Sequence, residues 1–176
     1  KSTNLGEVYG ATGDKEIANE VSRNKGKSII TNKTHLTGTD RIFEAFKKLN
    51  LNNIDYIINL QGDEPLIDTN DIINLNNLAI NNNFEIATLA CRLKTQNATN
   101  ENIVKVICNN NIENNKFSSA KNFLRIIESE NLENVYHHIG IYIYKVSALE
   151  KFVSLKQTPN EIKLKLEQLR ALENNI

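Results

Sequence analysis

The chain has 176 residues, of which 40% are hydrophobic, and its 21 Lys and Arg residues balance its 21 Asp and Glu residues. A chain of this length can bury a core, and the absence of a basic excess argues against a nucleic-acid partner. No apolar stretch reaches the ~20 residues that a membrane span needs, and the N-terminus lacks the apolar core of a signal peptide. We therefore expect a cytoplasmic protein without a nucleic-acid or membrane partner.

The sequence contains no methionine and begins at Lys1, which indicates either a processed chain or a piece of a longer protein. We favour the second interpretation. The sequence has no internal repeat and no Gly/Ser-rich linker, so a single α/β domain over residues 1–176 is expected.

Strands and helices alternate through the first half of the chain. Short apolar runs predict strands, and apolar residues spaced three or four apart predict helices. The expected strands span residues 5–11, 28–31, 55–60, 85–93 and 103–108, and the expected helices span residues 15–24, 40–49 and 69–81. Because a helix joins most strands to the next, this order predicts a parallel sheet with helices on its faces.

The second half of the chain is less regular. We expect a helix over 120–127, a strand over 135–146, a short helix over 147–155 and a final helix over 160–174. In that last helix the stripe of Ile162, Leu166, Leu169 and Leu172 is expected to be buried, whereas its flank of Glu167, Gln168 and Arg170 has the pattern of a solvent-facing surface.

An acidic pair follows the strand expected over 55–60. This strand stops at Gly62 and Pro65, and Asp63 and Glu64 lie between them. Ligands bind at the carboxyl ends of parallel strands, and carboxylates bind Mg²⁺, which would attract the phosphates of a nucleotide. The pair is therefore a candidate metal site. The alternative is that Gly62 forms a turn and the two acids cap the next helix.

A second candidate site lies in the polar loop 32–40 and the helix that follows it. Arg41 lies in the first turn of that helix, where a positive charge opposes the helix dipole unless it binds a phosphate or a base edge. The alternative is that Thr39 and Asp40 simply cap the helix. On the strand over 135–146, His137 and His138 face opposite ways, so they are not expected to bind one metal ion together.

Four short motifs occur together in one order: TGTDR at 37–41, NLQGDEPLI at 59–67, HIGIY at 138–142 and KLEQLR at 165–170. In this combination the sequence closely resembles the CMP-Kdo synthetase family, the 3-deoxy-manno-octulosonate cytidylyltransferases. The resemblance implies a Rossmann-like three-layer nucleotide-diphospho-sugar transferase fold, a homodimer, and a cytoplasmic role in lipopolysaccharide biosynthesis. The implied reaction joins CTP and Kdo into CMP-Kdo with release of pyrophosphate, and its implied cofactor is Mg²⁺.

The resemblance also assigns roles to individual residues. It implies that Asp63 is the catalytic metal ligand. It implies nucleotide binding for Thr39, Asp40, Arg41 and Gln61. It implies contacts to the sugar acid for His138, Tyr142, Glu167 and Gln168.

The chain departs from the family pattern at several places. The family's N-terminal triphosphate loop and a C-terminal metal-binding aspartate find no match, so we expect an incomplete form of the fold. Gly13 replaces the aspartate of an Ala-Thr-Asp motif, and Ser119 replaces the arginine of a Phe-Ser-Arg motif that would meet the sugar's carboxylate. Loss of such a charge-assisted contact costs ~1.5 to 3 kcal/mol. Two alternatives therefore stay open: a cytidylyltransferase for another sugar acid, such as a sialic acid, and a catalytically inactive remnant.

Overall fold

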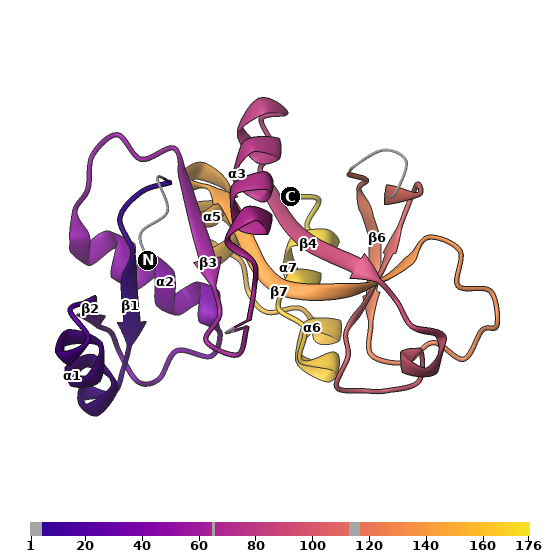
Figure 1. The fold of residues 1–176 in the computed structure, drawn as a ribbon, viewed down its shortest axis with the longest axis horizontal. Helices are drawn as coiled ribbons and strands as arrows, with labels where there is room; N and C mark the ends of the chain where they lie inside the picture. Colours follow the sequence, from indigo (N-terminus) through magenta and orange to yellow (C-terminus); the bar gives the residue numbers. More distant parts are fainter. Residues whose placement is uncertain (1–4, 65, 113–116) are drawn as a thin grey trace. The chain divides into compact units, whose positions relative to one another are not determined.

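A computed structural model describes residues 5–64, 66–112 and 117–176 of the chain. Its contacts divide the chain into two compact units: unit 1 comprises Lys1–Ala87 and Tyr142–Val153, and unit 2 comprises Thr88–Ile141 and Ser154–Ile176. The boundary falls inside two strands, β4 (Ile86–Arg92) and β7 (Val135–Lys145), which is the long orange strand of Figure 1. The single domain expected over 1–176 stays a prediction, and Pro65, to which the sequence assigns the end of a strand, lies outside the described residues.

Unit 1 begins with a small parallel sheet flanked by helices (Figure 1). Its elements are β1 (Tyr9–Thr12), α1 (Lys15–Arg23), β2 (Lys27–Ile30), α2 (Gly38–Leu49), β3 (Tyr56–Leu60), α3 (Thr69–Asn81) and α5 (Val146–Ser154). Strands β1 and β2 pair in parallel and form a two-stranded sheet by themselves, whereas β3 pairs with β7. Helix α2 packs against β1, β2 and β3.

The helices of unit 1 begin at side-chain caps. Asp14 caps α1 by accepting a hydrogen bond from the amide of Glu16, and Asp68 caps α3 through the amide of Asn70. Helix α2 is capped by Thr37, whose extended backbone lets its hydroxyl accept from the amide of Asp40, so the expectation that Thr39 and Asp40 cap this helix is wrong. A core of this unit joins α2, β3, β7 and α5 with the start of β4. It contains Tyr142, Tyr144 and Leu149, with Ile42, Phe43, Ile57, Ile86 and Val153 packed against them.

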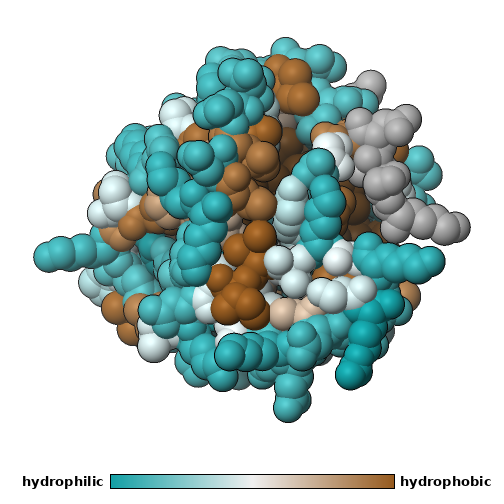
Figure 2. Space-filling view, turned by 90° about the vertical axis from the view of Figure 1, so that its left-hand side faces the viewer, coloured by the Kyte–Doolittle hydropathy of each residue, from teal (hydrophilic) through white to brown (hydrophobic). Residues whose placement is uncertain are grey.

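Unit 1 also exposes apolar side chains. Val8 is 67% exposed, Ile17 55% and Leu36 78%. Figure 2 shows the face that carries α1, β1 and β2, where hydrophobic residues form a band between hydrophilic ones. Within the described residues, no helix is long and apolar enough to cross a membrane.

Unit 2 is built on antiparallel strands. Besides its parts of β4 and β7, it contains η1 (Thr95–Asn97), β5 (Lys105–Cys108), β6 (Ala120–Leu124), α6 (Pro159–Leu164) and α7 (Gln168–Glu173). Strand β5 pairs antiparallel with both β6 and β7, in the order β3-β7-β5-β6 with β4 also on β7. The expectation of a parallel sheet is therefore wrong for β5, which pairs antiparallel with both of its neighbours.

Two expected helices of unit 2 differ from the structure. The helix expected over 120–127 is the strand β6, and Phe123 on it is buried with Val106 and Tyr136. The single helix expected over 160–174 is two helices, because Lys165 adopts a left-handed conformation (φ 54°) between α6 and α7. Leu166 and Leu169 are buried as expected, whereas Ile162 is 60% exposed.

Candidate active site

The residues to which the sequence assigns nucleotide binding meet at the carboxyl ends of the strands of unit 1. A Cβ atom built on Gly38, at the start of α2, would lie 3.6 Å from Nε2 of Gln61, just after β3. Asn59 on β3 also donates a hydrogen bond through Nδ2 to Oγ1 of Thr39, at 3.5 Å. The structure thus brings the first turn of α2 and the end of β3 together.

Thr39 is fully buried at this junction. Its hydroxyl lies 3.2 Å from the hydroxyl of Tyr144, in addition to its contact with Asn59. Its side chain therefore fixes the first turn of α2 against β3 and β7. Asp40 is half-buried in the same turn, where Oδ2 accepts a hydrogen bond from the Thr37 hydroxyl at 2.8 Å.

Arg41 ties α2 to the end of β2. Its Nη1 donates to Oγ1 of Thr31 at 2.9 Å and to the carbonyl oxygen of Asn32 at 3.1 Å. A Cβ atom built on Gly13 would lie only 3.0 Å from Nη1 of Arg41 and 3.0 Å from Cα of Lys33. The absence of a side chain at Gly13 therefore leaves the room that Arg41 and Lys33 occupy.

Glu44 holds the loop that precedes α2, and the sequence analysis missed it. Its carboxylate accepts from the amide of Asn32 at 2.9 Å and from Nζ of Lys48 at 2.6 Å, and it also bonds Nε2 of His35. These three donors, Lys48 first, lower the pKa of Glu44 to about 2. Glu44 and Lys48 lie four residues apart on a helix, and this spacing is the sequence signal that could have indicated their ion pair.

Asp63 is exposed in the turn that follows β3. The amide of Glu64 donates to the carbonyl of Gln61 at 3.2 Å, which makes residues 61–64 a turn. Because Asp68 caps α3, neither Asp63 nor Glu64 serves as that cap. The proposed turn and the acidic pair are thus both present, and neither acid caps α3.

The carboxylate of Asp63 could serve as one ligand of a magnesium ion. Within the described residues, Asp63 makes no hydrogen bond or ion pair, and no group of three or more His, Cys, Asp or Glu side chains could hold a metal by itself. Mg²⁺ is commonly held by one or two carboxylates together with substrate phosphates. One free carboxylate beside the nucleotide-binding residues is therefore compatible with such an ion.

The residues assigned to the sugar acid belong to both units. His138, Glu167 and Gln168 are in unit 2, whereas Tyr142 is in unit 1, where it is 3% exposed and stacks on Tyr144 at 5.9 Å between ring centroids. His138 is 7% exposed and meets the ring of Phe123 edge-on at 5.3 Å. Burial is the main cause that lowers the pKa of His138 to about 4, with the neighbouring His137 adding to it. The imidazole is therefore neutral near pH 7.

Glu167 and Gln168 lie at the corner between α6 and α7. Gln168 is only 8% exposed, and among the described residues its side chain makes no hydrogen bond. Its amide still reaches solvent, because within the described residues the buried side-chain polar atom without a partner is Oδ1 of Asn134. The solvent-facing flank expected for this helix is wrong at Gln168 and at Arg170, which is 2% exposed.

Two arginines brace this corner, and the sequence analysis assigned neither of them a structural role. Arg170 bonds the buried carboxylate of Glu161 through Nε at 3.0 Å and through Nη2 at 2.5 Å. Arg125, just past β6, donates to the carbonyl oxygens of Leu164 at 2.6 Å and Lys165 at 3.1 Å. Glu161 is part of a capping box with Thr158 at the start of α6. The corner that carries Glu167 and Gln168 is therefore held from both sides.

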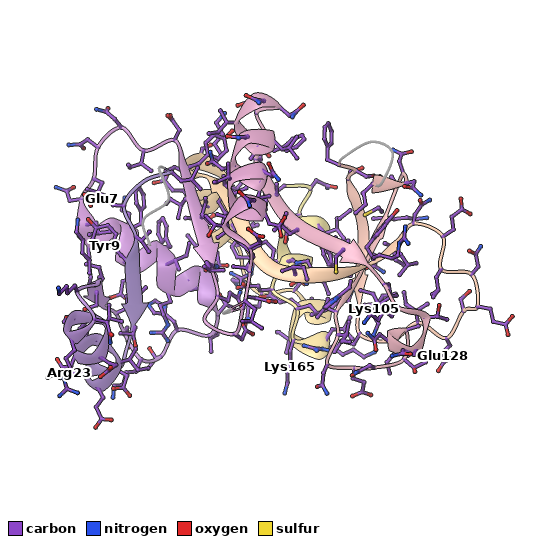
Figure 3. All side chains as sticks on the ribbon, viewed as in Figure 1. Glu7, Tyr9, Arg23, Lys105, Glu128 and Lys165 are labelled. Atoms are coloured by element: carbon purple, nitrogen blue, oxygen red, sulfur yellow. The ribbon has the colours of Figure 1, made fainter. Side chains whose placement is uncertain are left out.

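Lys105 is a further buried charge of unit 2. Lys105 is fully buried, and its Nζ donates to the carbonyl oxygens of Asn100 and Arg125, each at 2.6 Å. Figure 3 labels Lys105 among the strands of this unit, together with the exposed Glu128 and Lys165. Desolvation is the main cause that lowers the pKa of Lys105. Lys105 thus fastens the segment around Asn100 to the end of β6.

Ser119 stands just before β6 and is exposed. Its Oγ accepts a hydrogen bond from Nδ2 of Asn109 at 2.6 Å. The hydroxyl is therefore used within the connection between β5 and β6, and it does not replace the charge of an arginine.

Comparisons with known proteins give one consistent result. The family model described as "Cytidylyltransferase" matches residues 1–176. A 3-deoxy-manno-octulosonate cytidylyltransferase of Rickettsia typhi is 39% identical over 174 residues, which cover 98% of this chain and 70% of that protein. Its counterpart in Thermodesulfovibrio yellowstonii is 42% identical over 184 residues, covering 98% and 71%.

A solved structure is also similar to this chain. It is described as CMP:2-keto-3-deoxy-manno-octonic acid synthetase complexed with CTP, and it matches with a TM-score of 0.84 and 31% identity over 97% of this chain and 69% of that one. The expected α/β, Rossmann-like fold is thereby confirmed, as is the resemblance carried by the four motifs. Since the family model matches the whole sequence, this chain belongs to the cytidylyltransferase family of CTP-dependent enzymes.

Proposed function

We propose that this chain activates Kdo with CTP and forms CMP-Kdo and pyrophosphate, in the cytoplasm, as a step of lipopolysaccharide biosynthesis. The observation that carries the proposal is the 39% identity over 98% of the chain to a protein named 3-deoxy-manno-octulosonate cytidylyltransferase. A solved structure at 31% identity that is described as complexed with CTP supports the choice of nucleotide.

The nucleotide is assigned to the carboxyl ends of the strands of unit 1. In this assignment Gln61 and the first turn of α2, with Thr39, Asp40 and Arg41, hold the cytidine nucleotide. Thr39 contributes indirectly, because its fully buried side chain fixes the position of that turn. Arg41 anchors the loop after β2 through Thr31 and Asn32. The protein thus contributes placement of the nucleotide, which is the main requirement of a phosphoryl-type transfer.

Asp63 is assigned to Mg²⁺. When bound, the ion would neutralise charge on the phosphates and help to orient them. The carboxylate of Asp63 has no other partner among the described residues, so it is available for this role. The absence of an all-protein metal cluster in the described part of the chain agrees with an ion that is held largely by the nucleotide.

Within unit 2, the sugar acid is assigned to His138, Glu167 and Gln168. In this assignment the amide of Gln168 and the neutral ring of His138 supply hydrogen bonds to a polyhydroxylated acid. The hydroxyl of Kdo that attacks the α-phosphate would be oriented by such contacts. A homodimer is part of the proposal through the family resemblance, and size-exclusion chromatography with light scattering measures it.

The test is pyrophosphate release by the purified chain with CTP, Kdo and Mg²⁺. We expect Asp63→Asn to lower the rate by at least about 100-fold, because removal of a metal-binding charge takes away several kcal/mol of transition-state stabilisation. The matched control is Asp68→Asn, the same change six residues away from the turn at Gly62, which keeps a good helix cap. Equal rates in the wild type and Asp63→Asn would overturn the metal assignment.

The same assay separates the other candidate functions. Turnover with a sialic acid and none with Kdo would identify a sialic acid as the substrate in place of Kdo. This comparison matters because Ser119 stands in place of the expected arginine. No turnover with either acid, in a chain that still binds CTP, would identify an inactive remnant.

A further inference from the structure

One face of α2 binds the end of β2 and the loop that follows it. This face carries Arg41, Glu44 and Lys48, which are three and four residues apart and therefore share one side of the helix. Lys48 donates through Nζ to the carbonyl oxygen of Ile30 at 2.8 Å, while the other two side chains both bind Asn32. All of these residues belong to unit 1. The loop is thus attached to the helix at several points.

Asn32 is held through both of its backbone polar groups. Its amide donates to Oε2 of Glu44 at 2.9 Å, and its carbonyl oxygen accepts from Nη1 of Arg41 at 3.1 Å. Its side chain closes a turn, because Oδ1 accepts from the amide and from the hydroxyl of Thr34, each at 3.0 Å. These bonds fix Asn32 relative to α2.

Glu44 uses both of its carboxylate oxygens. Oε2 binds the amide of Asn32 and Nε2 of His35, whereas Oε1 accepts from Nζ of Lys48 at 2.6 Å. A glutamine in this place would have one acceptor oxygen, and its NH2 group would face another donor. Only a carboxylate therefore satisfies all three donors at once, and such charge-assisted bonds are stronger than neutral ones.

Arg41, to which the nucleotide is assigned, takes its orientation from the same loop. Its Nη1 donates to Oγ1 of Thr31 at 2.9 Å and to the carbonyl oxygen of Asn32. A guanidinium is planar and rigid, so these two bonds restrict where Nε and Nη2 point. A group that is held in place before its ligand arrives loses less conformational freedom on binding. Any displacement of Asn32 would therefore move the group that is expected to meet the nucleotide.

We propose that Glu44 is a positioning residue, which holds Asn32 and thereby fixes Arg41 before CTP binds. The identity of the ligand rests on the proposed function. Glu44 does not touch the nucleotide in this account, so its removal weakens binding through Arg41. The loop is then preorganised by the protein and not by the ligand.

The first test uses the chain without nucleotide. Amide hydrogen exchange at Asn32, followed by NMR, should be about 3- to 10-fold faster in Glu44→Ala, the value of one hydrogen bond, and intermediate in Glu44→Gln. Alanine favours helices, so α2 should stay intact, which circular dichroism checks. The matched control is Glu20→Ala, which removes an exposed carboxylate of α1 and should leave this exchange unchanged. Equal exchange in the wild type and Glu44→Ala would overturn the proposal.

The second test measures CTP binding by titration calorimetry in the presence of Mg²⁺. Glu44→Ala should raise Kd about 3- to 10-fold, whereas Glu20→Ala should leave it unchanged. In a chain that already carries Arg41→Gln, Glu44→Ala should cause little further loss, because both changes act on one contact. An unchanged Kd in Glu44→Ala, or losses that multiply in the double variant, would overturn the positioning role. If the wild type binds no CTP, the proposed function fails, while the exchange rates still decide whether Glu44 fixes Asn32.

Discussion

His138 shows how strongly one buried side chain can depend on pH. Its pKa is about 4 in the folded protein and near 6.5 when unfolded. Between these values the unfolded chain binds the proton and the folded chain does not, so stability is full above pH 6.5 and falls as the pH drops. The difference corresponds to about 3 kcal/mol at pH 4.

Urea unfolding at pH 7, 6, 5 and 4.5 measures this effect. We expect the free energy of unfolding to fall steeply below pH 6.5 in the wild type. The variant His138→Gln should lose that part of the slope, whereas His137→Gln should keep most of it. The same slope in His138→Gln as in the wild type would contradict this assignment.

At the scale of residues, the sequence indicates residues that lie within one motif. It does not indicate pairs of residues that lie far apart in the sequence and meet only in the folded chain. Asp63 could be proposed because it follows a strand closely, and Gln61 because it lies in a motif that resembles the family. Thr88 could not be found from its own segment, since its partner His138 lies 50 residues away and no local pattern connects them. Glu161 and Arg170 look like surface charges on an amphipathic helix, and only the break at Lys165 turns them toward each other.

The corner between α6 and α7 depends on an ion pair that is almost wholly buried. Glu161 and Arg170 are each 2% exposed. Removing one partner of such a pair leaves an uncompensated charge and costs about 3 to 5 kcal/mol, whereas replacing both with apolar residues of similar size is often neutral. We therefore expect Glu161→Leu and Arg170→Met to be strongly destabilising alone and far less so together.

Chemical denaturation of the two single variants and the double variant measures this coupling. The double variant should recover most of the lost stability, and its KM for Kdo should still rise because Glu167 and Gln168 lose their bracing. Single variants that lose less than about 1 kcal/mol, or additive losses in the double variant, would contradict a tightly coupled pair.

At the scale of elements, local signals predict the beginning of a helix better than its end. Asp14 and Asp68 cap α1 and α3, as the preference of Asp for that position indicates. The end of α6 has no such signal, since Lys165 takes the left-handed conformation that glycine or asparagine usually adopts. The segment expected to be a helix over 120–127 instead forms strand β6, because its pairing with β5 outweighs local propensity.

At the scale of the whole molecule, unit 1 has open sheet edges. Within the described residues, β1 pairs only with β2, and β3 pairs only with β7. Unpaired strand edges and exposed apolar side chains such as Val8 favour association between chains. We therefore expect the isolated chain to be poorly stable and to self-associate as its concentration rises.

Thermal unfolding and light scattering over a range of concentrations test this expectation. Val8→Lys, next to β1, should reduce the association, because a lysine beside an edge opposes strand pairing. Asn19→Lys on the exposed side of α1 adds the same charge away from the edge and should have little effect. A cooperative melt at about 45–65 °C with no association would count against the expectation.

Arg125 also has a consequence for the order in which unit 2 folds. Its bonds to the carbonyl oxygens of Leu164 and Lys165 close loops of 39 and 40 residues, and its bond to the carbonyl of Glu101 closes one of 24. Long loops are costly to close early, so such contacts form once the strands between them are paired. We therefore expect β5 and β6 to pair before the corner at Lys165 forms, so that the corner that carries Glu167 and Gln168 is completed late in the folding of unit 2.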